Sequence, residues 1–148
     1  MAGFPRVNAM NRHQARKLAF SLLFEREFDR TRDVAELYDT AKAARGEEEN
    51  KYVRKVLLGV AEHEAELEEM IGEAAEGWSL TRISKVSLAI LKLAVYEMRY
   101  CLDIPIRVSL NEAIELVKEF DEDSARGFVN GILNTLATRI KAERPDEA

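Results

Sequence analysis

The sequence contains few of the residues that disulfides, tight turns and membrane spans require. Its single cysteine, Cys101, cannot form a disulfide within the chain, so nothing calls for an oxidising compartment. Three prolines and seven glycines are few for a β-sandwich, which needs frequent turns. No apolar run approaches the length of a membrane span, and residues 1–10 lack the apolar block of a signal peptide. We therefore expect a cytoplasmic protein without a membrane segment.

The residue sets that catalysis and metal binding require are missing as well. His13 and His63 lie in different segments, and with one cysteine no zinc site of ordinary ligand type and spacing can be written. No glycine precedes Lys-Ser or Lys-Thr at the spacing of a phosphate-binding loop. The serines lack the context of an activated nucleophile, and carboxylates on helical faces are more often solvated than catalytic. The sequence predicts a protein that is not an enzyme and has no cofactor or metal.

Helical periodicity is the strongest positive signal. The chain has 148 residues, of which 47% are hydrophobic and 33% charged, so it can bury one core. The first apolar stripe follows the spacing of one helix face: Ala15, Leu18, Ala19, Leu22 and Leu23. Similar stripes follow within residues 34–41, 52–74, 83–95, 113–120 and 128–140, with a weak phase at 61–65. The pattern predicts an all-α fold, a compact bundle of six or seven helices.

Residues that favour helix N-termini precede several of these stripes. We expect them to act as N-caps, because their side-chain oxygens can accept hydrogen bonds from the free N–H groups of a first helical turn. The candidates are Asp33, Thr81, Ser109 and Ser124.

Charge is distributed unevenly along the chain. The net charge is −5, but residues 1–17 contain no carboxylate and carry the basic side chains Arg6, Arg12, His13, Arg16 and Lys17. Cations in the first turns of a helix oppose its dipole at a cost of roughly 0.3–1 kcal/mol each. An external anion such as nucleic-acid phosphate would offset that cost, and the alternative is a charged face that only improves solubility.

Two phenylalanines follow this basic run at helical spacing. Phe20 and Phe24 are four residues apart and therefore lie on one side of the predicted helix. Aromatic rings beside a basic face can stack on unpaired bases. Packing in the core is the commoner fate of such side chains, and both readings stay open at this point.

Taken together, these segments resemble the NusB family of bacterial transcription-antitermination factors, from about Arg12 to Ala137. The resemblance is carried by short motifs in a fixed order: Ala15-Arg16 with the apolar helix to Phe24, Gly59-Val60, and residues 78–83, 90–97, 103–105, 111–116 and 128–133. The last three, Asp-Ile-Pro, Asn-Glu-Ala-Ile-Glu-Leu and Phe-Val-Asn-Gly-Ile-Leu, are the most specific in combination.

The resemblance implies an organisation for the whole chain. We expect a single domain, residues 1–148, in which two small helical sub-bundles at about 12–60 and 63–140 pack across each other. Residues 1–11 would then form a flexible basic arm, and residues 141–148 a frayed tail.

The resemblance also implies a function. Family members bind the boxA element of nascent transcripts, especially ribosomal RNA leaders, pair with the small-subunit ribosomal protein NusE and act on elongating RNA polymerase. The RNA-facing positions correspond here to Arg12, His13, Arg16 and Phe24, with Ser124, Arg126 and Phe128 before and within the Phe-Val-Asn-Gly motif. With the other basic residues of the first segment, Arg6 and Lys17, they form the predicted RNA-binding set.

One departure from the family concerns the helix near the NusE-docking region. Family members often carry an acidic–basic pair where this chain has Ser87-Leu88. We take Ser87, Leu88, Tyr96 and Glu97 as candidates for a partner interface, although Tyr96 fits a core position equally well. An apolar Leu88 in place of a charge could also serve a homodimer contact.

Two other functions stay open. The chain could be a protein-binding helical scaffold, or a homodimeric RNA-binding module related to the N-terminal domain of ribosomal-RNA cytosine methyltransferases. Its length argues against a fused enzyme, because nothing follows Ala148 that could form a cofactor-binding sheet. Exchange of Arg12 and Arg16 for glutamate separates RNA recognition from a scaffold role.

Overall fold

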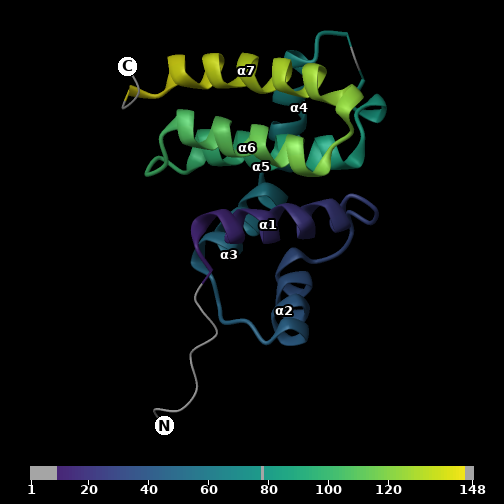
Figure 1. The fold of residues 1–148 in the computed structure, drawn as a ribbon, viewed down its shortest axis with the longest axis vertical. Coiled ribbons are helices and arrows are strands. Elements are labelled where there is room, and N and C mark those ends of the chain that lie inside the picture. Colours follow the sequence, from purple (N-terminus) through teal and green to yellow (C-terminus); the bar gives the residue numbers. More distant parts are fainter. Residues whose placement is uncertain (1–9, 78, 146–148) are drawn as a thin grey trace.

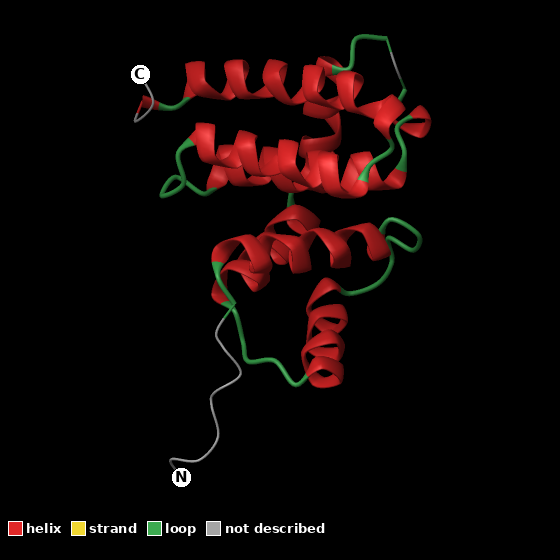
Figure 2. Cartoon of the chain, viewed as in Figure 1, coloured by secondary structure: helices red, strands yellow, loops and turns green. Residues whose placement is uncertain are grey.

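The computed structural model describes residues 10–77 and 79–145. Within these ranges the chain forms helices and no β-strand (Figures 1 and 2), which confirms the predicted all-α fold. The α-helices are α1 (Arg12–Arg26), α2 (Val34–Arg45), α3 (Lys51–Glu62), α4 (Glu64–Ala74), α5 (Lys85–Tyr100), α6 (Ile106–Phe120) and α7 (Arg126–Glu143). Two 3₁₀ turns, η1 (Leu80–Arg82) and η2 (Asp123–Ala125), precede α5 and α7. No helix of the described part is both long and apolar enough to cross a membrane.

Helix α5 lies at the centre of the arrangement. Figure 1 shows α1, α2 and α3 in the lower half of the molecule, with α5 and α6 above them and α7 along the top. Helix α5 contacts α1, α3, α4, α6 and α7. Because neighbours cover it on all sides, every residue from 87 to 98 is buried.

The predicted apolar stripes form the contacts between these helices. On α1, Ala15, Leu18 and Leu22 are buried against α3 and α5. Burial of a large aliphatic side chain contributes about 1.5–3 kcal/mol, so a stripe of this length is sufficient to hold the helix in place. The weak phase at 61–65 corresponds to a real break, since α3 ends at Glu62 and α4 begins at Glu64.

Helices α3 and α5 approach each other closely at a glycine. The ring of Tyr96 packs directly on the backbone of Gly59, where a Cβ atom would lie 2.1 Å from the Tyr96 Cζ atom. A side chain at position 59 would therefore force the two helices apart. This contact places Tyr96 in the core, one of the two positions that the sequence allowed.

Only one of the four predicted N-caps is correct. Asp33 caps α2, since its side chain accepts a hydrogen bond from the Ala35 amide at 2.9 Å. Thr81 lies in the 3₁₀ turn η1, and Ser84 caps α5 in its place by accepting from the Ser87 amide. The reason is that the η1 turn takes up the residues around Thr81, so the α-helix starts three residues later than expected.

The two remaining caps fail for different reasons. Helix α6 begins at Ile106, directly after Pro105, so Ser109 already lies inside the first turn of the helix. Its hydroxyl donates to Glu97 instead of capping. Ser124 belongs to the 3₁₀ turn η2 and makes no side-chain cap for α7.

The end of the chain is anchored up to Arg144, contrary to the expected frayed tail at 141–148. Helix α7 continues to Glu143, and Arg144 is buried. Its guanidinium donates to the backbone carbonyls of Met98, Leu102 and Ile104, which are the acceptors left free where α5 ends. Residues 146–148 lie outside the described residues, as do residues 1–9 of the expected basic arm.

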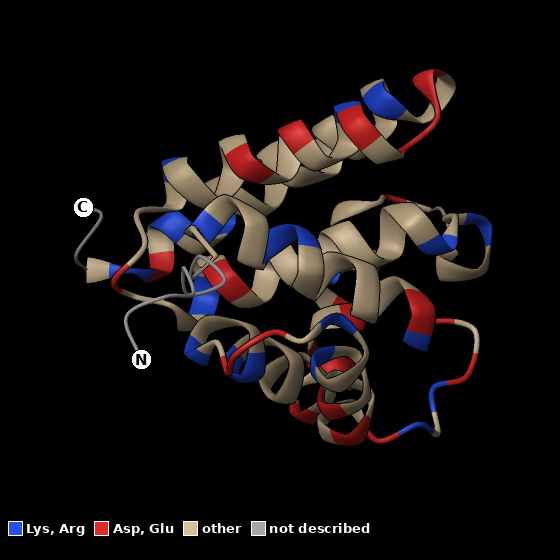
Figure 3. Ribbon diagram, turned by 60° about the horizontal axis from the view of Figure 1, so that its bottom comes forward, with Lys and Arg blue, Asp and Glu red and all other residues tan. Residues whose placement is uncertain are grey.

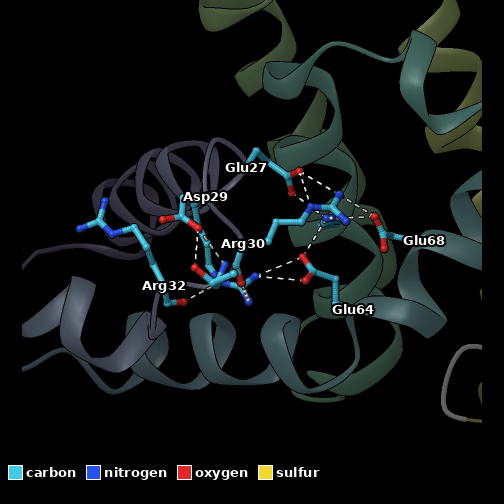
Figure 4. A network of polar contacts seen from close by, with 9 residues as sticks. Glu27, Asp29, Arg30, Arg32, Glu64 and Glu68 are labelled. Carbon is cyan, nitrogen blue, oxygen red and sulfur yellow. Dashed lines mark hydrogen bonds and ion pairs between the residues drawn. The ribbon is translucent and has the colours of Figure 1, made fainter.

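An ion-pair network joins the end of α1 to α4 and α5 (Figure 4). The Lys92 ammonium is fully buried and donates to Glu27 at 2.6 Å and to Glu64 at 2.8 Å. Glu68 lies 3.5 Å from the same nitrogen, and Arg30 binds both Glu27 and Glu68. A buried lysine needs such partners, because an isolated charge in the interior is strongly unfavourable. The network therefore fixes how the end of α1 meets α4 and α5.

Candidate nucleic-acid interface

The basic residues of the first segment lie on the first two turns of α1. The helix starts at Arg12 because Asn11 and Gln14 form a capping box, in which each side chain accepts a hydrogen bond from the backbone N–H of the other. Arg12 and His13 are exposed, and Lys17 is half-buried one turn further on. Arg6 lies outside the described residues.

Carboxylates of α6 partly neutralise this basic face. His13 Nδ1 lies 3.0 Å from Glu112, and Lys17 Nζ lies 2.7 Å from Glu119. For these two side chains the prediction that an external anion offsets the charge of the first turns is wrong, because Glu112 and Glu119 already do so. Their partners lie about a hundred residues away in the sequence, so the local pattern gave no sign of them.

Arg12 has a different environment. Its guanidinium stacks over the ring of Tyr52, with 4.5 Å between its central carbon and the ring centroid. No carboxylate among the described residues lies within ion-pair distance of it. The stacking orients the side chain without neutralising its charge, so Arg12 remains available to an anion.

Arg16 belongs to the interior and not to the exposed basic face. It is only 3% exposed and forms a two-pronged ion pair with Glu97, at 2.9 Å from Nε and 2.6 Å from Nη2. Burial by itself lowers the pKa of this guanidinium, but the hydrogen bond to Glu97, together with the effects of Tyr52 and of the Glu97 and Glu112 charges, raises it further than burial lowers it. Arg16 therefore stays charged and cannot reach a nucleic acid at the surface.

Glu97 connects four helices through this pair. Besides Arg16 of α1, it accepts hydrogen bonds from the Tyr52 hydroxyl of α3 at 2.6 Å and the Ser109 hydroxyl of α6 at 2.9 Å. Burial, together with the charge of Glu97, raises the pKa of Tyr52, so the phenol remains a neutral donor. Since Tyr52 is the ring on which Arg12 stacks, the buried network also positions Arg12.

The aromatic residues form a cluster at the other end of α1. Phe20 is buried and contacts both Phe24 and Phe120, with ring centroids 6.2 Å and 4.9 Å apart. Phe24 is half-buried and contacts Phe28 edge-on at 5.2 Å. Phe28 and Phe120 are the exposed members, at 66% and 41%. Of the two predicted stacking residues, Phe20 thus belongs to the core and Phe24 reaches the surface.

Sequence reasoning missed the exposed members of this cluster. The signal for Phe28 was present, because it continues the four-residue spacing of Phe20 and Phe24. Phe120 lies a hundred residues away and gave no such sign. An open groove of about 460 Å³ connects it to the basic face, and is lined by Met10, Gln14, Lys17, Leu18, Ser21, Arg45, Glu47 and Phe120. Basic and aromatic surfaces therefore adjoin along α1.

The three predicted residues in η2 and at the start of α7 lie beyond the end of α6 and not beside Arg12. Ser124 is exposed, whereas the Arg126 guanidinium is held by Asp123 and by the Lys118 carbonyl, both at 2.9 Å. Phe128 is half-buried and lines a separate hollow between the end of α4 and α7. The structure does not bring these side chains together with Arg12.

The predicted partner interface is wrong. Ser87, Leu88, Tyr96 and Glu97 are all buried, with exposed fractions between 1% and 6%. They lie on α5, which five other helices cover, so no partner can reach them and Leu88 cannot form a homodimer contact. Ser87 is satisfied internally by donating to Asp121 at 2.5 Å, which explains how a polar residue occupies this position.

Figure 3 shows Lys and Arg positions gathering on the left side of the view, among fewer acidic ones. No group of three or more potential metal ligands occurs among residues 10–77 and 79–145. The arrangement offers an oriented cation, a partly neutralised basic helix face and exposed aromatic rings. These are the components with which proteins contact the backbone and the bases of single-stranded nucleic acid.

Comparison with known proteins gives a consistent picture. The family model described as the NusB family matches residues 13–138. The transcription antitermination protein NusB of Bacillus velezensis is 44% identical over 133 residues, which cover 90% of this chain and all of that protein. The protein of the same name from Bacillus subtilis is 41% identical, over 89% of this chain and 98% of its own length.

Solved structures share the fold. NusB of T. maritima is 32% identical with a TM-score of 0.80, over 88% of this chain and 93% of that one. A chain from a crystal structure of antitermination factors NusB and NusE with double-stranded RNA is 22% identical, with a TM-score of 0.76. The two structures superpose over 88% of this chain and 99% of that chain. At 22% identity, this similarity establishes a shared fold only.

Proposed function

Because the chain belongs to the NusB family, we propose that it is a transcription antitermination factor that binds single-stranded, boxA-type RNA in nascent ribosomal transcripts. It would act without catalysis, as an adaptor in the cytoplasm between the transcript and elongating RNA polymerase. One observation carries this proposal. The guanidinium of Arg12 is oriented over the Tyr52 ring, and no carboxylate of the described residues forms an ion pair with it.

We further propose a division of labour among the predicted RNA-binding residues. Arg12 contacts RNA directly. His13 and Lys17 contact RNA after giving up their ion pairs with Glu112 and Glu119 of α6. Arg16 positions Arg12 through Glu97 and Tyr52. The exposed aromatic end of α1, with Phe24, adjoins this face and can stack bases. Ser124, Arg126 and Phe128 remain candidates at a distance from it.

The small number of unpaired cations suggests that the protein needs a partner to bind RNA tightly. Each phosphate contact with single-stranded RNA adds only about 0.7 to the salt dependence of binding, so a few cations give modest affinity. We propose NusE as the partner that enlarges the RNA-binding surface, because joining two weak binders raises affinity without new contacts on either. The exposed Phe28 and Phe120 are better candidates for its docking than the buried residues of α5.

One observation favours the alternative of a protein-binding scaffold. The internal ion pairs of His13 and Lys17 show that part of the basic face already serves the fold. A scaffold would bind its protein partner and show no measurable affinity for RNA, with or without that partner.

The charge reversal Arg12→Glu tests the proposal. We expect it to lower affinity for a fluorescent boxA-type RNA by roughly tenfold, since it replaces an attractive contact by a repulsive one. The control is Lys141→Glu, which makes the same change in charge at an exposed position of α7. Equal losses in the two variants, with both folded, would contradict a contact at Arg12.

A further inference from the structure

A second cationic feature lies next to Arg12, on helix α3. A pocket of about 170 Å³ is lined by Arg12, Lys51, Tyr52, Lys55, Cys101, Asp103 and Ile104. Three of these seven residues are cations: Arg12 and Lys51 each start a helix, and Lys55 lies one turn after Lys51. The pocket is smaller than the roughly 300–1,000 Å³ of ordinary small-molecule sites, so it suits an ion-sized group.

The lysines of this pocket are not neutralised by the fold. Lys51 and Lys55 are exposed, and no ion pair joins either of them to a carboxylate of the described residues. In contrast, Arg54 on the same helix is held by Asp39 and Glu49. Asp39 and Glu49 thus neutralise Arg54, whereas the charges of Lys51 and Lys55 beside the pocket remain without an ion-pair partner among the described residues.

The cations converge on the pocket and do not point apart. Lys51 and Lys55 are one turn apart and therefore share a face of α3. Cys101 lines the pocket with these cations. Burial raises the pKa of its thiol to about 11, and the positive charges of Lys55 and Arg12 both act to lower it. Asp103 is the one carboxylate that lines the pocket, so three formal positive charges face one negative charge.

The local backbone increases the demand for an anion. Arg12 and Lys51 each occupy the first position of a helix, and neither α1 nor α3 has an acidic residue in its first turn. Both cations therefore oppose a helix dipole with no acidic residue in their own first turn, and Asp103 is the one carboxylate in the pocket. A bound anion would relieve both at once.

We propose that this pocket, formed by Arg12, Lys51 and Lys55, binds a backbone phosphate of the RNA strand, so that the RNA path turns from α1 onto the start of α3. RNA is the occupant that the surroundings favour, because Arg12 belongs both to this pocket and to the basic face of α1. The inference rests on the proposed function and adds two contacts to it. A phosphate contact carries no sequence information, whereas a base contact does.

The double variant Lys51→Gln/Lys55→Gln tests the inference in titrations of boxA-type and scrambled single-stranded RNA. We expect affinity for both RNAs to fall by the same factor, about 3- to 30-fold, as for two exposed ion pairs. The slope of log affinity against log salt should become shallower by about 0.7 for each lysine. Lys51→Arg/Lys55→Arg should retain the wild-type affinity and slope.

The matched control is Arg139→Gln/Lys141→Gln on α7, which removes two exposed cations and lowers the net charge equally. An equal loss in this control would overturn the inference, because charge alone would then explain it. Unchanged binding by Lys51→Gln/Lys55→Gln would overturn the inference and leave the proposed function intact. A loss confined to the boxA-type RNA would also overturn it. No RNA binding by the wild type, alone or with NusE, would overturn the proposed function itself.

Discussion

At the scale of single residues, Glu97 joins helix α5 to three other helices. It is buried and accepts hydrogen bonds from Arg16, Tyr52 and Ser109 on three other helices. We expect Glu97→Gln to lower the free energy of unfolding by roughly 3–5 kcal/mol, because it removes the two-pronged partner of the buried Arg16 charge and leaves only Glu112, at 3.6 Å, as a counter-charge. Ser109→Ala removes one hydrogen bond to the carboxylate and should cost less, about 1.5–3 kcal/mol.

Urea denaturation of the two variants measures this difference. The order of the two losses is the decisive result. A Glu97→Gln protein as stable as Ser109→Ala would contradict the account, since it would mean that Arg16 does not depend on the charge of Glu97.

A second prediction at this scale concerns acid. Burial tends to raise the pKa of Glu64, but the hydrogen bond and charge of Lys92, with those of Arg26, lower it below its ordinary 4.5. A carboxylate with a lowered pKa stabilises the fold fully above its unfolded pKa, and this contribution is lost as pH falls through its folded pKa. We therefore expect Glu64→Gln to be less stable than wild type at pH 7, by about 1–3 kcal/mol, and the gap to shrink below about pH 4.5.

Denaturation curves at several pH values from neutral to acid give this gap directly. Glu69→Gln, an exposed residue of the same helix, serves as the control and should leave the pH dependence unchanged. A gap between Glu64→Gln and wild type that stays constant on acidification would show that the Lys92 network does not depend on the charge of Glu64.

At the scale of helices, the contact between α3 and α5 depends on the absence of a side chain at Gly59. An added methyl group would lie 2.1 Å from the Tyr96 ring. Gly59→Ala should therefore destabilise the fold by about 1–3 kcal/mol, although alanine is the better helix former. Gly72 on α4 provides the matched control, since a Cβ there meets nothing within 4 Å.

We expect Gly72→Ala to stabilise the protein by about 0.5–1 kcal/mol, the ordinary gain from replacing glycine within a helix. Thermal and urea unfolding of both variants measure the opposite signs. Two changes of the same sign would mean that the close approach of Tyr96 to Gly59 is not a constraint on packing.

The helices could be predicted from the sequence because their apolar stripes are long and regular. Asp33 was the one correct cap; the starts that rested on a serine or threonine could not be predicted, since such a residue before a stripe has several possible partners. Thr81 was taken up by a 3₁₀ turn, and Ser109 turned inward to Glu97, which lies on another helix. The anchored end of α7 was equally hidden, because Arg144 finds its acceptors about forty residues away in sequence.

At the scale of the whole molecule, the same limit explains which parts of the candidate site were foreseen. The basic start of α1 was visible as a run without carboxylates. The sequence could not show that Glu97 takes Arg16 into the core, or that α6 carboxylates hold His13 and Lys17. The prediction of a partner interface on α5 was wrong for a related reason. Five other helices bury α5, and this burial arises only when the bundle is assembled.

The uneven charge of the molecule also sets how it should bind RNA. The net charge is −5, yet Arg12, Lys51 and Lys55 form a local surface with few internal partners. If only these three cations, which have no ion-pair partner among the described residues, contact phosphates, the slope of log affinity against log salt is about −2. Binding by this protein alone should therefore be weak and sensitive to salt.

The most direct test of the central claim is a titration of fluorescent boxA-type RNA with this protein, alone and with its own NusE, at two salt concentrations. A scrambled RNA serves as the control. The account predicts weak, salt-dependent binding by the protein alone, which tightens with NusE and then favours the boxA-type sequence. Absence of RNA binding in both mixtures, with the protein folded, would contradict it and leave a helical protein-binding scaffold.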